Sequence, residues 1–380
     1  MEKLFYQDQE IKEFTANVTG CAQTDKGWEV TLDATAFYPT GGGQACDLGM
    51  LGNANVLDVS ERGVQIIHLC DGPLEVGKTV TGKIDWARRF DLMQQHTGEH
   101  IVSGIIHRLY GHQNSGFHVG EELMEVDFDG PLPEGALEEI QRLANEAVWA
   151  DLPVNCYVPS PEELPGVVYR TKRALPWPVR IVEIPGIDTC ACCGIHTKRT
   201  AQVGLIYIFS CVKFHQGVRL ELLCGKRAYD YVAAVTEQNR QISGLLSAKP
   251  LETAAAAKRL GEQLAAEKFR ATGLEKQLFE TIAKSYVNQT RVLHFEEGLT
   301  SAAVRELADR IGKSVQTAVV CSGSDDSGYS ICIIGKNAKE LGAKTAAALN
   351  GRGGGKPEAF QGSLKATRAE ITAFLHSQGF

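Results

Sequence analysis

The chain has 380 residues, of which 43% are hydrophobic and 22% charged, a composition typical of a globular protein with two or three domains. A formal net charge of −7 excludes a protein that coats nucleic acid non-specifically, and no apolar run approaches the ~18–20 residues of a membrane span. The first residues lack the apolar core of a signal peptide. We therefore expect a cytoplasmic chain whose eleven cysteines are reduced thiols or metal ligands.

Residues 1–88 are expected to be a small β-barrel or sandwich, because short apolar alternations are separated by turn residues. One stretch within them, Phe37–Gln44 followed by Asp47 and Gly49, is too glycine-dense for a strand. Consecutive glycines allow positive φ and close backbone approach, as at a phosphate or substrate contact. A tight loop within the barrel is the alternative. The candidate substrate- or tRNA-binding residues in this stretch are Gly41, Gly42, Gly43 and Gln44.

Residues 89–227 are expected to form an α+β domain. The apolar spacing predicts a helix over Phe90–Tyr110 and a second one over Pro133–Ala150. Strands are expected at Leu123–Phe128, at Val179–Ile184 and within 203–224.

Two pairs of metal-binding side chains lie within this domain. His96 and His100 are four residues apart in the first helix, so both rings lie on one face. Cys192 and His196 have the same spacing in a predicted loop that opens at Pro185-Gly186. Three imidazoles and one thiolate can hold Zn²⁺, either as a closed structural site or as a site with one position open to water. Cys190 and Cys193 are alternative thiolate ligands, and Glu99, off the ligand face, favours a supporting or solvent-exposed role.

Residues 228–290 are expected to be a helical connector, split near Lys249-Pro250 because proline interrupts a helix. An interrupted apolar seam runs along its second half, at Leu260, Leu264, Leu274, Leu278 and Ile282. This seam fits either packing onto the body of the protein or a dimerising coiled coil, and hence a homodimer.

Residues 291–380 are expected to form an α/β domain that is slightly basic, with eleven Lys and Arg against nine Asp and Glu. The predicted strands are Val315–Cys321 and Tyr329–Ile334, and the predicted helices are Ser301–Ile311, Ala338–Leu349 and Lys365–His376. Between the last two helices, a glycine-rich loop offers backbone N–H donors beside two cations, a plausible phosphate-binding nest. A flexible connector is the alternative. The candidate residues are Arg352, Gly353, Gly354, Gly355 and Lys356.

Taken together, these features resemble the freestanding alanyl-tRNA editing proteins of the AlaX type, which are related to the editing and C-terminal regions of alanyl-tRNA synthetase. His96-x-x-x-His100 matches the first zinc motif of the family, and Asp188–His196 matches the second. The second motif usually reads Cys-Gly-Gly-Thr-His, and here Cys193 and Ile195 replace one glycine and the threonine. The stretch Phe37–Gly49 is similar to the glycine-rich motif of the longer members. Gly351–Gly362 is similar to the glycine-rich loop of the synthetase's C-terminal domain.

The resemblance implies zinc-dependent hydrolysis of the ester that joins a wrong amino acid, chiefly serine and sometimes glycine, to tRNA(Ala). Packing alone cannot make a synthetase reject serine strongly, so a second, hydrolytic site is needed. By position, Asn114 and Ser115 are candidates for sensing the serine hydroxyl, and a polar turn is the alternative. Two other interpretations stay open. One is a related editing module for another mischarged tRNA, and the other is a non-catalytic tRNA-binding protein with structural zinc.

Overall fold

The computed structural model describes residues 1–120, 122–171, 175 and 177–380. The chain divides into two compact units, Met1–Gln241 and Ile242–Phe380. Both combine helices with mainly antiparallel sheets, so the predicted α+β class is confirmed. In the described part of the chain, no helix is both long and apolar enough to cross a membrane.

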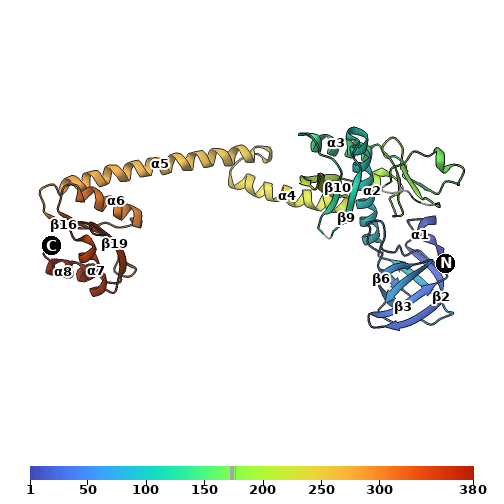
Figure 1. Ribbon diagram of the computed structural model, residues 1–380, viewed down its shortest axis with the longest axis horizontal. Helices are drawn as coiled ribbons and strands as arrows, with labels where there is room; N and C mark the ends of the chain where they lie inside the picture. The colour runs from blue at the N-terminus through green and yellow to red at the C-terminus, as the bar shows by residue number, and fades with distance from the viewer. Residues whose placement is uncertain (121, 172–174, 176) are drawn as a thin grey trace. The chain divides into compact units, whose positions relative to one another are not determined.

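The first unit begins with a closed six-stranded barrel, visible at the blue end of the ribbon in Figure 1. Strand β2 pairs with β3 on one side and with β8 on the other, which closes the barrel without a free edge. Alternate residues of β2, namely Phe14, Ala16 and Val18, point into its apolar core. In order around the barrel, the strands are β2 (Glu13–Thr24), β3 (Gly27–Leu32), β7 (Gln65–Cys70), β6 (Ala54–Arg62), β5 (Gly49–Leu51) and β8 (Thr79–Ile84). Outside it lie β1 (Glu2–Lys3), α1 (Leu4–Gln7) and β4 (Ala34–Thr35).

Helix α2 (Trp86–Tyr110) follows the barrel directly and is the central element of this unit. The Asp85 carboxylate caps its first turn by accepting from the backbone N–H of Arg88, and Gly111 ends it in the left-handed conformation. The helix starts one turn earlier than the predicted Phe90. Every residue from Leu92 to Ile106 is buried, because other elements surround the helix on all sides.

A four-stranded antiparallel sheet and helix α3 (Ala136–Trp149) pack against α2 around a shared apolar core. The sheet order is β14 (Ile206–Phe214), β15 (Gly217–Cys224), β10 (Met124–Phe128) and β9 (Asn114–Val119). The short 3₁₀ turns η1 (Leu164–Gly166) and η2 (Thr200–Val203) lie between these elements in sequence.

A small three-stranded sheet carries the second ligand pair toward α2. It consists of β11 (Asn155–Tyr157), β12 (Ile181–Ile184) and β13 (Asp188–Ala191). The prediction of a loop from Pro185 onward is wrong for Asp188–Ala191. After a short turn the chain returns as β13, whose backbone pairs with β12, and only Cys192–His196 lie in a loop.

Helix α4 (Gly225–Leu245) crosses the boundary between the two units. The second unit continues with η3 (Pro250–Glu252) at the predicted proline break and the long helix α5 (Thr253–Ser285). Its sheet has the order β16 (Arg291–Phe295), β17 (Thr317–Ser324), β18 (Gly328–Gly335), β20 (Ala359–Leu364) and β19 (Arg352–Lys356).

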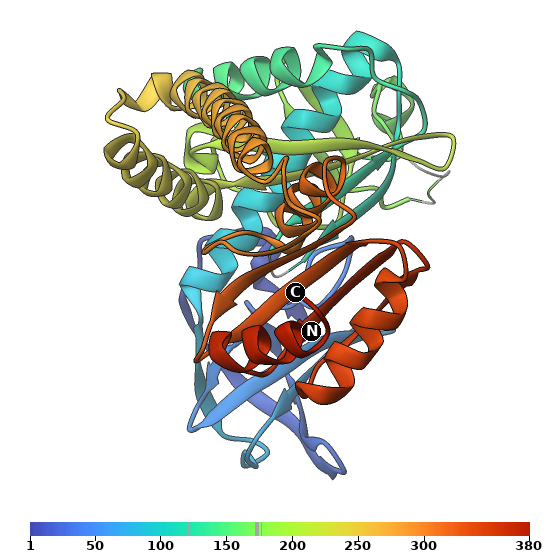
Figure 2. The same cartoon turned by 90° about the vertical axis from the view of Figure 1, so that its left-hand side faces the viewer.

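Helices cover both faces of this sheet, since neighbouring residues of β17 and β18 contribute to two different cores. The end of α5 and helix α6 (Ser301–Gly312) share one core with Ala318 and Val320. Helices α7 (Ala338–Ala348) and α8 (Arg368–Ser377) share the other with Val319 and Cys321. Figure 2 shows this unit with its strands side by side.

The prediction of a glycine-rich loop over Gly351–Lys356 is wrong. Arg352–Lys356 form strand β19, which pairs antiparallel with β20 at the edge of the sheet. In a strand, successive N–H groups point to opposite sides, so they cannot converge on one phosphate as they would in a nest.

Candidate metal centre

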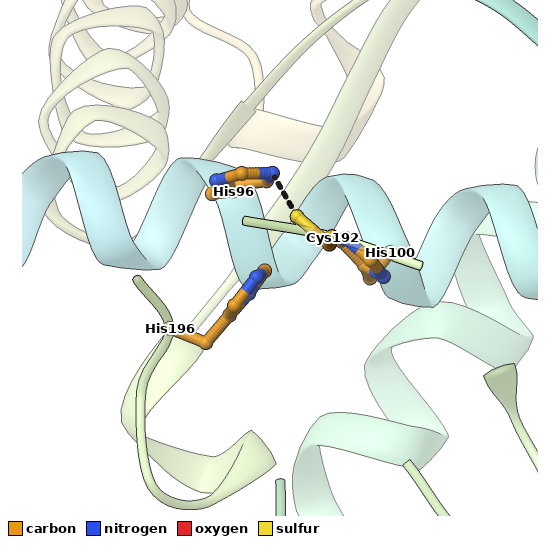
Figure 3. A group of neighbouring side chains, drawn as sticks. All are labelled: His96, His100, Cys192 and His196. Atoms are coloured by element: carbon orange, nitrogen blue, oxygen red, sulfur yellow. Dashed lines mark hydrogen bonds between the residues drawn. The ribbon is translucent and has the colours of Figure 1, made fainter. Parts of the chain in front are cut away.

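Four side chains from two separate segments meet beside helix α2 (Figure 3). His96 and His100 come from adjacent turns of the helix, and Cys192 and His196 come from the loop after β13. One ligand atom from each lies within 4.8 Å of all the others. The thiol sulfur of Cys192 is 3.4 Å from His96 Nε2, and the three histidines are almost completely buried. The structure thus brings together the four residues that the sequence predicts as ligands.

Each imidazole is held by a hydrogen bond at its outer nitrogen. His96 Nδ1 lies 2.9 Å from Gln44 Oε1, His100 Nδ1 lies 2.9 Å from Asp188 Oδ2, and His196 Nδ1 lies 3.3 Å from Thr97 Oγ1. With Nδ1–H donated outward, the Nε2 lone pairs face one another. This is the arrangement by which metal-binding histidines are oriented in proteins.

Asp188 is itself fixed by Arg170, whose guanidinium donates to both carboxylate oxygens at 2.7 and 2.8 Å. Burial would raise the pKa of Asp188, but the hydrogen bonds from His100 and Arg170 outweigh burial and hold it at about 2. The carboxylate therefore stays charged and holds the His100 ring in place. Nothing in the sequence around Arg170 signals this role.

The three neighbouring thiols have different environments. Burial opposes ionisation of Cys192, yet the charge and hydrogen bonds of the surrounding histidines place its pKa well below the usual value. Burial raises the pKa of Cys190 to about 11, and burial also raises the pKa of Cys193. Since the thiolate is the form that binds zinc, Cys192 is better suited than Cys190 or Cys193 to be the zinc ligand. Cys190 lies close to His100 and Asp188 in a second possible group, and Cys193 is exposed.

The donor set fits zinc. With Zn–N and Zn–S bonds of about 2.0 and 2.3 Å, a tetrahedral ion separates N and S ligands by roughly 3.5 Å. The 3.4 Å between His96 Nε2 and Cys192 Sγ is close to that separation. His196 Nε2 is buried and has no hydrogen-bond partner among the described residues, as expected for a nitrogen that faces a cation.

The glycine-rich stretch of the barrel lies against this centre. Residues Gly41 and Gln44 pair with each other through two backbone hydrogen bonds of 3.0 Å, and the turn between them uses positive φ at Gly42 and Gly43. A methyl group on Gly42 would lie 3.0 Å from Cys193 Sγ, and one on Gly43 would lie 2.4 Å from the Phe117 ring. The glycines thus allow the turn to approach the ligand loop and β9, and Gln44 then reaches His96 and the backbone N–H of Ile195.

A buried polar group is linked to the ligands through Glu99, whose Oε2 lies 3.8 Å from His100 Nε2. Asn114, the first residue of β9, donates from Nδ2 to Glu99 Oε1, and Ser103 donates to the same oxygen at 2.5 Å. Because a carboxylate only accepts, this contact fixes the amide so that Asn114 Oδ1 points the other way. That oxygen is buried and has no partner among the described residues. Ser115 is exposed and lies where β9 shifts register against β10, so it does not share the buried position of Asn114.

Ile195 does not face the ligands. It is fully buried in a small apolar cluster with Phe5, Tyr38 and Met93. The departure from the family's threonine is therefore accommodated by packing.

Comparisons with known proteins match this arrangement in three segments. Residues 2–88 match the family described as "tRNA synthetases class II (A)", residues 179–219 match "Threonyl and Alanyl tRNA synthetase second additional domain", and residues 284–377 match "DHHA1 domain". Along nearly its whole length, the chain is 29% identical to the alanyl-tRNA editing protein Aarsd1-A of Xenopus laevis, covering 94% of this chain and 90% of that protein. These matches confirm that the chain resembles the AlaX-type alanyl-tRNA editing proteins.

Two further relatives are consistent with this family. Aarsd1 of Rattus norvegicus is 29% identical over 99% of this chain and 97% of its own length. The alanine–tRNA ligase of Thermofilum pendens is 30% identical over 96% of this chain, but that match covers only 42% of the ligase. This chain therefore corresponds to less than half of that ligase.

Proposed function

We propose that this AlaX-type chain hydrolyses mischarged tRNA(Ala) in the cytoplasm, chiefly Ser-tRNA(Ala) and also Gly-tRNA(Ala), in a zinc-dependent reaction. The observation that carries the proposal is a cluster of four convergent side chains that can hold a metal, together with Asn114, which binds Glu99 beside His100 and whose Oδ1 is buried without a partner among the described residues. The relatives Aarsd1-A and Aarsd1 are named alanyl-tRNA editing proteins, which supports the editing part of the proposal.

The ligands for zinc would be His96, His100, Cys192 and His196. When bound, zinc would supply a fixed positive charge that holds or polarises the aminoacyl ester. Gln44, Asp188 and Thr97 keep the three imidazoles oriented, and burial of the rings excludes bulk water from them. These contacts position the ligands without taking part in bond breaking.

Asn114 accounts for selection of serine over alanine. Its Oδ1 can accept a hydrogen bond from the serine hydroxyl, and Glu99 holds the amide in the required orientation. Alanine has only a methyl group there and would leave the buried oxygen unsatisfied. Such a loss costs about 1–3 kcal/mol, roughly a 10- to 100-fold preference.

For the tRNA itself, we propose the exposed edge strand β19 as a contact. Arg352 and Lys356 are four residues apart, so they lie on the same face of the strand about 13 Å from each other. Gly354 lies between them, and nothing is within 4 Å of the position where its side chain would begin. Two cations and an open backbone suit a phosphate backbone, which Gly353 and Gly355 would also approach. The turn Gly41–Gln44 would approach the acceptor end.

The test is deacylation of Ser-tRNA(Ala) by the purified chain, with Cys192→Ala as the metal-site variant. We expect hydrolysis by the zinc-loaded chain and its loss in Cys192→Ala. Full activity of Cys192→Ala after zinc removal would exclude a role for the metal. Intact ester in the presence of bound tRNA would instead support a non-catalytic tRNA-binding protein.

A matched pair of variants tests the sensing residue. Asn114→Ala should lower kcat/KM for Ser-tRNA(Ala) about 10- to 100-fold, since it removes the acceptor. Ser115→Ala, at the adjacent and exposed residue of β9, should leave it nearly unchanged. A panel of other mischarged tRNAs separates this function from a related editing module: faster hydrolysis of a seryl-tRNA other than Ser-tRNA(Ala) would favour the latter.

A further inference from the structure

Glu99 is a buried carboxylate beside the ligands, and its two oxygens have different surroundings. The residue is only 4% exposed. Its Oε1 accepts hydrogen bonds from Ser103 Oγ and Asn114 Nδ2. Its Oε2 accepts none from the part of the chain that the structure describes, and it lies 3.8 Å from His100 Nε2. Because a buried carboxylate oxygen without a donor is costly, a donor or cation from outside the chain would stabilise it.

The free oxygen of Glu99 borders the face of α2 that carries the ligands. His100 uses Nδ1 to bind Asp188 at 2.9 Å, so its Nε2, the atom next to Oε2, is the one that faces the other ligands. On the preceding turn, the His96 ring stacks on Phe117 of β9 with ring centroids 5.0 Å apart. Helix α2 and strand β9 therefore enclose one space, and Oε2 lies at its edge.

The charges around the ligands make this oxygen important. Three neutral imidazoles and one thiolate would leave a bound Zn²⁺ with a net charge of +1. The charge of Asp188 is balanced by Arg170, which donates to both of its oxygens. Glu99 has no lysine or arginine partner among the described residues, so its carboxylate would bring the net charge of the site to zero.

We infer that Glu99 Oε2 binds the α-ammonium group of the aminoacyl ester, so that the site selects esters whose α-amine is free. This inference rests on the proposed function, since it concerns the ester that is deacylated there. An α-amine is largely protonated near neutral pH, and its hydrogen bond to a carboxylate is charge-assisted. Without Glu99, the net positive charge of the metal site would repel this group.

Together, Glu99 and Asn114 match the two donors of a seryl group. The hydrogen bond between them joins Glu99 Oε1 to Asn114 Nδ2. The two acceptors that remain, Glu99 Oε2 and Asn114 Oδ1, each share a carbon atom with one of the bonded atoms. In serine, the ammonium and the hydroxyl group are likewise on adjacent carbons. Glu99 would bind the group that all aminoacyl esters share, and Asn114 the group that distinguishes serine from alanine.

The experiment compares two esters that differ only at the α position. Ser-tRNA(Ala) carries the ammonium group, and glyceroyl-tRNA(Ala) has a hydroxyl group in its place. Because the two esters differ in intrinsic lability, the quantity compared is the ratio of kcat/KM for the seryl ester to kcat/KM for the glyceroyl ester. Glu99→Gln removes the charge but keeps an oxygen that can accept from Asn114 and Ser103, so this ratio should fall about 10- to 100-fold. An unchanged ratio would overturn the inference.

The zinc content of the variant separates binding of the ammonium group from binding of the metal. Glu99→Gln should retain as much zinc as the unaltered chain, measured by inductively coupled plasma mass spectrometry, because the four candidate ligands are intact. Loss of zinc from this variant would mean that Glu99 is itself a metal ligand, and it would overturn the assignment of Oε2 to the ammonium group.

Glu221 on β15 offers a matched control. Its carboxylate also accepts from a serine hydroxyl, at 2.7 Å from Ser210 Oγ. Its neighbours Leu220 and Leu222 point into the core shared with α2, so Glu221 faces away from that core. Glu221→Gln should change neither the ratio nor the zinc content. An equal fall of the ratio in this variant would contradict a specific role for Glu99.

The same measurements distinguish failure of this inference from failure of the proposed function. If the unaltered chain hydrolyses Ser-tRNA(Ala) and the ratio is unchanged in Glu99→Gln, the proposed function stands and only the role of Glu99 is excluded. If the unaltered, zinc-loaded chain hydrolyses neither ester, the proposed function is excluded and this inference with it.

Discussion

The turn Gly41–Gln44 and the strand β19 both contain three consecutive glycines, but their surroundings differ. In the turn, a methyl group on Gly43 would lie 2.4 Å from Phe117, and the following Gln44 is buried against His96. In the strand, the atoms nearest to a methyl group on Gly353 or Gly355 belong to β20, and every residue from Arg352 to Lys356 is exposed. One glycine run therefore joins two domains at the metal centre, whereas the other keeps the edge of a sheet open.

The residues that follow the glycines account for this difference. Three residues after Gln44, the carboxylate of Asp47 is fully buried and paired with Arg89 of α2. This ion pair ties the barrel loop to the helix that carries His96 and His100. After β19 the chain turns back at once as β20, which is the strand that β19 pairs with. Consecutive glycines allow the backbone to approach another part of the protein closely. The residues that follow the glycines determine which part that is.

The largest expected effect on stability comes from breaking the ion pair between Asp47 and Arg89. Arg89 is fully buried, donates to Asp47 and also reaches the carbonyl of Ile11 at 2.9 Å. Arg89→Met would leave the Asp47 carboxylate buried without its partner, so the free energy of unfolding should fall by about 3–5 kcal/mol. Urea denaturation measures this. Arg352→Met on the exposed strand β19 is the control and should change stability by less than about 0.5 kcal/mol. Similar losses of stability in both variants would contradict the difference between the buried turn and the exposed strand.

The next effect compares one glycine from each run. Gly43→Ala must accept a positive φ and a methyl group against Phe117, so we expect a loss of about 2–4 kcal/mol. Gly354→Ala meets no atom within 4 Å and should be neutral to within about 0.5 kcal/mol. Thermal denaturation of Gly43→Ala and Gly354→Ala measures the difference in melting temperature. Equal melting temperatures would mean that the turn does not pack as closely as the structure indicates.

Sequence patterns predicted the elements whose signals are local. The four candidate ligands follow from two four-residue spacings, one within a helix and one within a loop, and the break before α5 follows from Pro250. The start of α2 was placed one turn late because its signal is the capping side chain of Asp85 and not an apolar residue. Strand β19 was missed because glycine has low strand propensity, and only pairing with β20 makes it a strand.

The partners of the ligands were harder to predict, since they depend on contacts between distant segments. Gln44 is 52 residues from His96 in sequence, and Arg170 reaches His100 only through Asp188. No spacing rule links such positions. Asn114 could be proposed from its place after the first motif, but its contact with Glu99 required the fold of β9 against α2.

A third prediction concerns the metal. Gln44→Ala removes the oxygen that orients His96, so zinc affinity should fall about 10- to 100-fold, as measured by competition with a chromogenic chelator. Gln44→Glu keeps an acceptor and should retain most of the affinity. The control is Gln361→Ala on β20, whose amide donates to Ser301 at 2.9 Å far from the ligands in sequence and in the other unit. An unchanged zinc affinity in Gln44→Ala would mean that the turn Gly41–Gln44 only packs against the site and does not orient His96.

The smallest effect is expected on the open strand. Arg352→Ala combined with Lys356→Ala removes two cations, and if both contact phosphates, affinity for tRNA should fall severalfold to about tenfold. The slope of log K against log salt should become shallower by about 1.4–1.8, because each lost contact with a phosphate contributes roughly 0.7–0.9. Filter binding over a range of salt concentrations measures both quantities.

The control pair Arg305→Ala and Lys313→Ala removes two cations from and just after α6, outside strand β19. If this control changes the slope equally, the attraction is diffuse and the strand makes no special contact. If only the strand variants change it, the open glycine run is a tRNA-binding element, in contrast to the buried one at the metal centre.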